Sequence, residues 1–76
     1  MNNQRRKEIK RLINELDMIK NELEQICNDE EDYHDNMPEN LQDSDRAMSS
    51  EEAIDNLNEA LENIENVMDN LENAME

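Results

Sequence analysis

Apolar residues recur at seven-residue intervals in the last third of the chain, from Ala53 to Glu76. When the second residue of each unit is taken as position a, positions a and d hold aliphatic side chains throughout, namely Ile54, Leu57, Leu61, Ile64, Met68 and Leu71. A sustained heptad of this kind is typical of a helix that packs along another helix. The pattern therefore predicts a helix over about residues 50–75.

A second heptad series occupies the first third of the chain, where positions a and d hold Ile9, Leu12, Leu16, Ile19, Leu23 and Ile26. It predicts a helix over about residues 3–33, with Asn2 or Asn3 as its N-cap. Residues 34–48 are dense in Asp and Asn and include Pro38, which indicates a turn. Ser49 and Glu52 have the spacing of a capping box, so we expect the second helix to begin at about Ser50.

The two series predict one all-α domain over residues 1–76, an antiparallel two-helix hairpin with coiled-coil-like packing. Position a then faces position d, and facing residue numbers add up to 80, as for Ile9 with Leu71 and Ile26 with Ile54. A shift of one heptad would alter the turn without breaking this pattern. The turn is centred on Asn40. This register also places the basic start of the first helix beside the acidic end of the second, which offers a reason for the cluster of Arg5, Arg6, Lys7, Lys10 and Arg11.

The charge balance limits the kinds of partner that we expect. The chain has 22 acidic and 7 basic residues and a net charge of -15, and such a surface repels phosphate backbones and anionic lipid. We therefore expect no direct nucleic-acid or membrane binding. High charge with few aromatic residues also fits disorder, but both heptad series argue against it. Cys27 is the only cysteine, which excludes an internal disulfide and favours a reducing cytoplasm.

A lone hairpin of this size is expected to be marginally stable. Each seam residue would contribute roughly 1.5–3 kcal/mol against a large ordering entropy, so a second copy is expected. Small and neutral residues follow one flank of the second helix, in the columns Ala53, Ala60, Val67, Ala74 and Asn56, Asn63, Asn70. They predict another helix on this side, giving a dimeric four-helix bundle. A coding bias toward Asn, of which the chain has 13, is the alternative explanation.

No pattern in the chain predicts a catalytic, cofactor-binding or metal-binding residue. Glu31 and His34 form half of a di-metal signature, but the second helix has no acid on its inner columns. The run from Asp29 to Asp32 lacks the alternation and the central Gly of a calcium loop. Cys27 has no orienting base beside it in the pattern. We therefore expect a non-enzymatic protein without a cofactor.

The feature with a plausible active role is a row of carboxylates, which we call the acidic ladder: Asp55, Glu59, Glu62, Glu65, Asp69, Glu72 and Glu76. A second acidic group precedes the turn and comprises Asp29, Glu30, Glu31 and Asp32. Many charge runs are only solvated faces. An unrelieved row of negative charge can also occupy a basic groove built for nucleic acid. The sequence thus predicts a protein partner with a basic groove, and the alternative is a structural or adaptor hairpin whose charge serves solubility.

Two segments carry a resemblance to known proteins: Asn36-Met37-Pro38-Glu39-Asn40-Leu41-Gln42 in the turn and Glu52-Ala53-Ile54-Asp55-Asn56-Leu57 in the second helix. In these segments the chain resembles small acidic helical-hairpin proteins of unknown function from Gram-positive bacteria and their phages. The resemblance implies a phage or mobile-element origin and a place in the host cytoplasm. It also implies an association with inhibitors of host defence, among them anti-CRISPR proteins, but it supplies no established activity.

Overall fold

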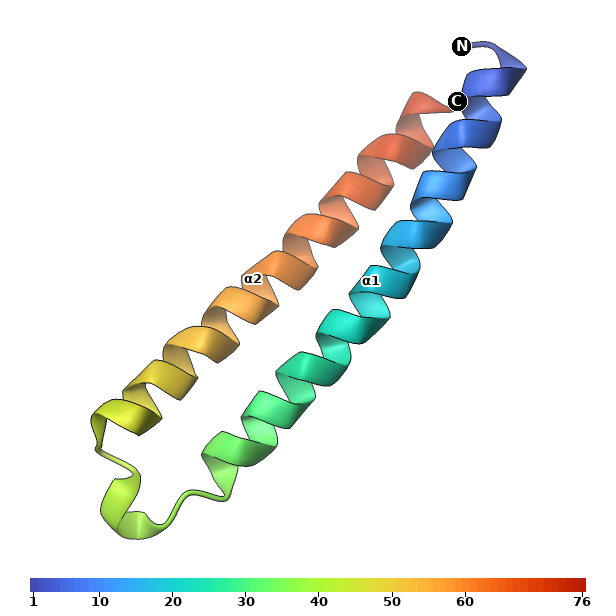
Figure 1. Cartoon of the computed structure of the whole chain (residues 1–76). Coiled ribbons are helices and arrows are strands. Elements are labelled where there is room, and N and C mark those ends of the chain that lie inside the picture. The colour runs from blue at the N-terminus through green and yellow to red at the C-terminus, as the bar shows by residue number, and fades with distance from the viewer.

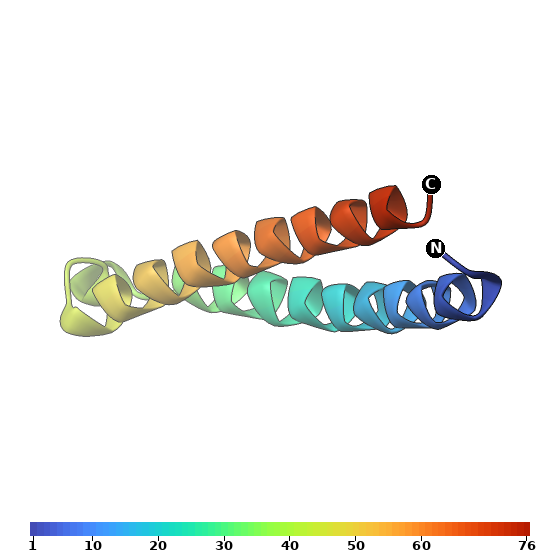
Figure 2. The same cartoon turned by 90° about the horizontal axis from the view of Figure 1, so that it is seen from above.

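The computed structural model describes all residues 1–76 and is a hairpin of two antiparallel helices. α1 (Asn3–Asp35) and α2 (Asp45–Ala74) lie side by side, and the 3-10 turn η1 (Glu39–Leu41) lies between them at the far end from both termini (Figure 1). The Cα atoms extend over 59 × 15 × 12 Å, and the helices cross at a shallow angle (Figure 2). The predicted all-α hairpin is confirmed.

The ends of α1 follow from local hydrogen bonds. The Asn2 side chain caps its start, because Oδ1 of Asn2 accepts a hydrogen bond of 2.8 Å from the main-chain nitrogen of Arg5. At the other end Nδ2 of Asn36 donates to the carbonyl oxygen of Asp32 at 2.8 Å. Pro38 then adopts an extended conformation, with φ -57° and ψ 149°, and stops the helix from continuing.

α2 begins five residues earlier than the predicted start at Ser50. Ser44 is its N-cap: Oγ of Ser44 accepts a hydrogen bond of 3.3 Å from the main-chain nitrogen of Ala47 and donates one to the carbonyl oxygen of Leu41. Asp45 follows in the first turn, where a carboxylate interacts favourably with the helix dipole. The capping box predicted at Ser49 and Glu52 is wrong, because this earlier cap already starts the helix and Ser49 lies inside it.

The face that α1 presents to α2 is rotated from the predicted one. Leu12, Ile19 and Ile26 are 39%, 45% and 52% exposed, which corrects their assignment to the seam within the hairpin. Between Ile9 and Cys27, the residues of α1 that are buried or half-buried are instead Ile9, Ile13, Leu16, Lys20, Leu23 and Cys27. On α2 the predicted seam residues are all half-buried, namely Ile54, Leu57, Leu61, Ile64, Met68 and Leu71.

Three polar contacts along one side of the hairpin account for this rotation, and we call that side the paired edge. They join Lys20 Nζ to Glu65 Oε1 at 3.1 Å, Cys27 Sγ to Asn58 Oδ1 at 3.4 Å, and His34 Nε2 to Glu51 Oε1 at 3.2 Å. On both helices these residues occupy the column directly after position d. Bringing that column of α1 against α2 turns the column of Leu12, Ile19 and Ile26 outward.

The paired edge also corrects the register. The residue numbers of each of its pairs, 20 with 65, 27 with 58 and 34 with 51, add up to 85 and not to the predicted 80. The end of α1 at Asp35 is therefore level with about residue 50, and the first turn of α2 extends beyond it. The connecting turn, still centred on Asn40, folds back over that overhang, and Met37, Ala47 and Ser50 become buried there. The neighbouring Met48 is exposed.

The hairpin by itself has little interior. Only 4 of its 76 residues are buried, and no large side chain is fully buried. Its accessible surface is 5825 Å², whereas a compact monomer of 9.0 kDa exposes about 4900 Å². The hairpin thus exposes several hundred Å² more than a compact fold of its mass.

Candidate interaction surfaces

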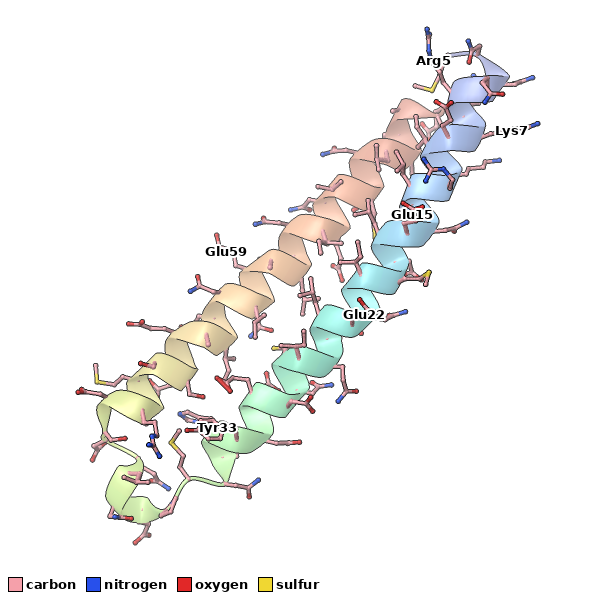
Figure 3. All side chains as sticks on the ribbon, viewed as in Figure 1. Arg5, Lys7, Glu15, Glu22, Tyr33 and Glu59 are labelled. Atoms are coloured by element: carbon pink, nitrogen blue, oxygen red, sulfur yellow. The ribbon has the colours of Figure 1, made fainter.

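All seven carboxylates of the acidic ladder are exposed. Six of them project from α2, the seventh, Glu76, lies just beyond its end at Ala74, and Glu59 points directly away from α1 (Figure 3). Residues 47–76 contain nine acids and no base, so no cation on α2 lies among them. The ladder therefore forms a one-sided array of negative charge on a rigid support.

One member of the ladder is neutralised from the other helix. Lys20 of α1 contacts Glu65, and this hydrogen bond and the attraction between the two charges raise the pKa of Lys20 above its usual value. No other Lys or Arg lies within ion-pair distance of an acid of α2. The remaining six carboxylates of the ladder are free of direct cationic partners.

The basic start of α1 does not form the predicted ion pairs with the acidic end of α2. Arg11 pairs with Glu15 of its own helix at 2.7 Å. Arg6 instead donates from Nε to the carbonyl oxygen of Met75 at 3.0 Å. This contact sets a positive charge at the C-terminal end of α2, where the helix dipole is negative. The interaction favours a basic residue at the start of α1, and the sequence pattern did not reveal it.

The second acidic group is divided between two sides of the hairpin. Asp29 and Asp32 are exposed and line the hollows described below, whereas Glu30 and Glu31 are half-buried. Oε1 of Glu31 lies 3.8 Å from Sγ of Cys27, which belongs to the paired edge. The four carboxylates therefore do not form one surface, and they do not continue the acidic ladder.

Cys27 is the most chemically distinct buried side chain. Its thiol is 3% exposed and free, and burial, with a smaller effect of the nearby Glu31 carboxylate, raises its pKa. A nucleophilic thiol requires the opposite shift, toward the thiolate. The contact between Cys27 and Asn58 thus acts as part of the helix packing.

His34 joins the two helices. Nε2 of His34 lies 3.2 Å from Oε1 of Glu51, and Nδ1 lies 3.7 Å from Oδ1 of Asp35. Glu31, its partner in the Glu-x-x-His motif, is directed to Cys27. No group of three or more His, Cys, Asp or Glu side chains is arranged to hold a metal ion. Residue spacing could not reveal the pair of His34 and Glu51, which are 17 positions apart.

The side opposite the paired edge carries apolar residues from both helices, and we call it the apolar face. α1 contributes the outward column of Leu12, Ile19 and Ile26, continued by the exposed Tyr33. α2 contributes the small column of Ala53, Ala60, Val67 and Ala74. In Figure 3 the front of α1 carries Tyr33 and two carboxylates, Glu15 and Glu22.

Two adjoining hollows mark the turn end of the apolar face. The larger is an open groove of about 710 Å³ lined by Ile26, Asp29, Glu30, Tyr33, Ala53, Asn56 and Leu57. The smaller, of about 390 Å³, shares Asp29 and Tyr33 with it and continues to Met37, Pro38 and Arg46. The larger groove places Ile26 and Tyr33 of α1 next to Ala53 and Asn56 of α2. The outward column of α1 and the Ala and Asn columns of α2 therefore belong to one surface.

Comparison with known proteins gives no match: no protein-family model, no curated protein and no solved structure resembles the chain closely enough to be assigned. Neither helix is long and apolar enough to cross a membrane. The function must therefore be argued from the two surfaces, the acidic ladder and the apolar face.

Proposed function

We propose that this chain is a non-enzymatic interaction protein that inhibits a nucleic-acid-handling protein by occupying its basic groove. The observation that carries the proposal is the exposure of all seven carboxylates of the acidic ladder, of which only Glu65 contacts a cation. Long-range attraction to a row of unpaired charge speeds association with a basic groove and favours binding there. The partner is a protein, and neither nucleic acid nor membrane binds the chain directly.

The spacing of the ladder supports this role. From Asp55 to Glu72 the helix rises about 26 Å and carries six carboxylates of the ladder, which gives roughly one carboxylate per 5 Å of axis. One strand of duplex DNA carries a phosphate every 3.4 Å or so. A single hairpin therefore offers about two-thirds of the linear charge of one strand. We further propose that two hairpins associate as a four-helix bundle, since one alone has little interior.

The resemblance to acidic phage proteins gives the proposal a setting. An origin in a phage and action in the host cytoplasm make bacterial defence nucleases natural targets, and the inhibitor is then of the anti-CRISPR or wider anti-defence type. Such targets hold nucleic acid in positively charged channels. The acidic ladder fits the electrostatic character of those channels.

The test is displacement of labelled duplex DNA from purified basic DNA-binding proteins, including a Cas9–guide RNA complex. We expect the chain to displace DNA, with an apparent affinity that falls at least ~10-fold when salt rises from about 50 to about 200 mM. The combined variant Glu59→Gln, Glu62→Gln, Asp69→Asn and Glu72→Gln should lose this activity. The matched control Asp17→Asn, Glu24→Gln, Glu39→Gln and Asp43→Asn removes as much charge elsewhere and should retain it. No displacement at low salt, or equal loss in both variants, contradicts the proposal.

A structural or adaptor role is the second candidate, and the apolar face favours it. A column of exposed Leu, Ile and Tyr beside a column of Ala suits helix packing with another chain. In that role the acidic ladder serves solubility only. Neutralising the ladder should then leave association through the apolar face intact and should produce no effect that depends on DNA.

A further inference from the structure

We propose that a second copy of this chain docks on the apolar face about a two-fold axis perpendicular to the helices, so that α1 packs on the partner's α1 and α2 on the partner's α2. This arrangement gives a geometry to the four-helix bundle of the proposed function. It rests on the proposed function only for the existence of that bundle. Each helix then has an antiparallel neighbour in the partner. The face meets an identical copy of itself, which is the condition for a closed two-fold dimer.

The positions of the two apolar columns make the face self-complementary. On α1 the column runs through residues 12, 19, 26 and 33, and its midpoint lies between residues 22 and 23. On α2 the column runs through residues 53, 60, 67 and 74, with its midpoint between residues 63 and 64. Contacts along the paired edge show that residues whose numbers add up to 85 are level with each other. The two midpoints are therefore level to within about one residue, about 1.5 Å of helix rise. A single axis passes through both, and it places Ile19 on the partner's Ile26 and Ala60 on the partner's Val67.

The charge distribution of α1 favours this antiparallel arrangement. The start of α1 is basic, with Arg5, Arg6 and Lys7, and its last turns are acidic, from Asp29 to Asp35. Antiparallel packing of α1 on the partner's α1 brings the basic part toward the acidic part. Parallel packing of these helices would bring like charges together, which is unfavourable. Lys7 and Lys10 have no ion-pair partner within the chain and are available for this interaction.

From residue 47 onward α2 contains acids and no base, so the two α2 helices can approach each other only through neutral side chains. The column of Ala53, Ala60 and Ala74 permits close packing, and the neighbouring column of Asn56, Asn63 and Asn70 is uncharged. A carboxylate at the edge of a helix contact would be costly to desolvate, whereas a neutral amide costs less and can form hydrogen bonds. The Ala and Asn columns of α2 share one surface with the exposed column of α1, so one partner can cover all three columns.

The area of the face suits a stable dimer. The hairpin extends over 59 by 15 Å, and a face of these dimensions covers roughly 900 Å². A standard protein–protein interface buries about 800 Å² on each partner. The accessible surface of 5825 Å² exceeds that of a compact monomer by a similar amount. A second copy of the chain is thus large enough to cover the apolar face without an additional partner.

The arrangement changes what the acidic ladder presents. Because the two α2 helices become neighbours, two ladders run side by side, with helix axes about 8–10 Å apart. The pair then carries about one carboxylate per 2.6 Å, which is about two-thirds of the charge density of duplex DNA with its one charge per 1.7 Å. A dimer of this geometry is a better electrostatic match to a duplex-binding groove than a single hairpin.

The first experiment measures association in solution by light scattering and sedimentation equilibrium. Ile19→Lys, in the centre of the face, should weaken dimerisation by at least about 100-fold, because it desolvates a charge against the partner's Ile26. Met18→Lys adds the same charge on the outer side of α1, where Met18 is 67% exposed, and should leave the dimer intact. A monomeric wild-type chain with full helix content, or equal effects of the two variants, would overturn the proposal.

The second experiment does not depend on how Ile19→Lys folds. In a Cys27→Ser background, Ile19→Cys and Ile26→Cys are prepared as separate proteins and oxidised alone or mixed. The axis places residue 19 beside residue 26 of the partner, while two copies of residue 19 lie about 10 Å apart, beyond disulfide reach. We expect disulfide dimers from the mixture and at least 10-fold less from either protein alone. Efficient disulfide formation by Ile19→Cys alone would overturn this axis.

Neither experiment contains a nucleic-acid-binding protein, so their outcome is separate from that of the DNA-displacement test. If the proposed function fails and this inference holds, the dimer forms but displaces no DNA. If this inference fails and the proposed function holds, the monomeric chain displaces DNA, and Ile19→Lys changes the displacement no more than Met18→Lys does.

Discussion

Nε of Arg6 donates a hydrogen bond of 3.0 Å to the main-chain carbonyl oxygen of Met75, and so the first turn of α1 holds the last turn of α2. The two residues are 69 positions apart, and the bond closes the open end of the hairpin. It satisfies a carbonyl that the end of a helix would otherwise leave to water. The guanidinium also adds a positive charge at the negative end of the α2 dipole.

Removal of this contact should loosen the end of α2. We expect Arg6→Gln to lower the free energy of unfolding by about 1 kcal/mol, as a charged hydrogen bond and a favourable dipole interaction are both lost. Arg5→Gln is the matched control, since Arg5 is exposed and no hydrogen bond or ion pair joins its side chain to α2. Thermal unfolding followed by circular dichroism gives the stability, and amide exchange at residues 72–76 locates the effect. Equal loss in both variants would mean that only the charge matters.

The start of α2 can be tested with two serines. Ser44→Ala removes the side chain that accepts from the amide of Ala47, and we expect a loss of about 1 kcal/mol in stability. Ser49→Ala changes a residue inside the helix and should have no effect or a slight stabilising one, because Ala is the better helix former. Denaturant unfolding of the two variants decides between the caps. A larger loss in Ser49→Ala would restore the predicted capping box.

Ser50 should respond in the opposite direction. Its Oγ is buried, and no other group of the chain forms a hydrogen bond with it. We expect Ser50→Ala to raise the free energy of unfolding by about 1 kcal/mol, the usual order for an unsatisfied buried polar group. Ser49→Ala serves again as the control for helix propensity, and calorimetry would measure the difference. Destabilisation by Ser50→Ala would show that the hydroxyl does have a partner, such as a bound water.

The Cys27 thiol should be unreactive and should make stability depend on pH. Since burial raises its pKa, the folded chain keeps the proton at a pH where the unfolded thiol, with an ordinary value of 9.0, has lost it. Stability is therefore unaffected by this group at neutral pH and decreases as the pH rises above 9.0. Lys20 acts in the same direction at higher pH: its raised pKa means that the contribution of its pair with Glu65 is complete below 10.5 and is lost above it.

Two measurements check this expectation. Iodoacetamide should modify Cys27 at least ~10-fold more slowly in the folded chain than in urea at the same pH. Unfolding of Cys27→Ser from pH 7 to 11 should lack the first decrease and keep the later one that belongs to Lys20. A folded thiol as reactive as the unfolded one would contradict the burial of Cys27.

Salt should strengthen the fold while it weakens binding to a basic groove. The net charge of -15 repels itself, and only Arg11 with Glu15 and Lys20 with Glu65 form Lys or Arg ion pairs. Screening therefore relieves more repulsion than attraction. A relief of 1 kcal/mol raises the melting temperature of a domain of this size by about 4–8 °C. Melting curves at low and high sodium chloride measure the effect, and a lower melting temperature at high salt would contradict it.

The sequence was sufficient for the two helices, because each keeps its apolar residues at seven-residue spacing over several turns. It was not sufficient for the rotation of α1. Leu12 and Ile13 are both apolar and both lie next to the Ile9 column, so the heptad pattern permits either as the inner residue. The choice depends on the pairs of Lys20, Cys27 and His34 with α2, which are visible only once the register is known.

The same limit explains the other differences. Ser44 and Ser49 are both acceptable caps by local rules, and the correct one depends on how far α2 extends beyond the end of α1. The acidic ladder could be predicted as an exposed row because all of its members avoid the inner columns. The apolar face could not be predicted. The heptad pattern had placed Leu12, Ile19 and Ile26 inside the hairpin, whereas they lie outward, beside the alanine column of α2.

Both termini of the hairpin lie at one end, opposite the Pro38 turn (Figure 1). Two copies docked head to tail would therefore send their termini out at opposite tips of a rod about as long as the single hairpin, 59 Å. A fluorophore attached at residue 1 of each copy would report weak energy transfer between copies, whereas fluorophores at neighbouring tips would report strong transfer. The position of the chain ends thus allows energy transfer to report the orientation of the two copies.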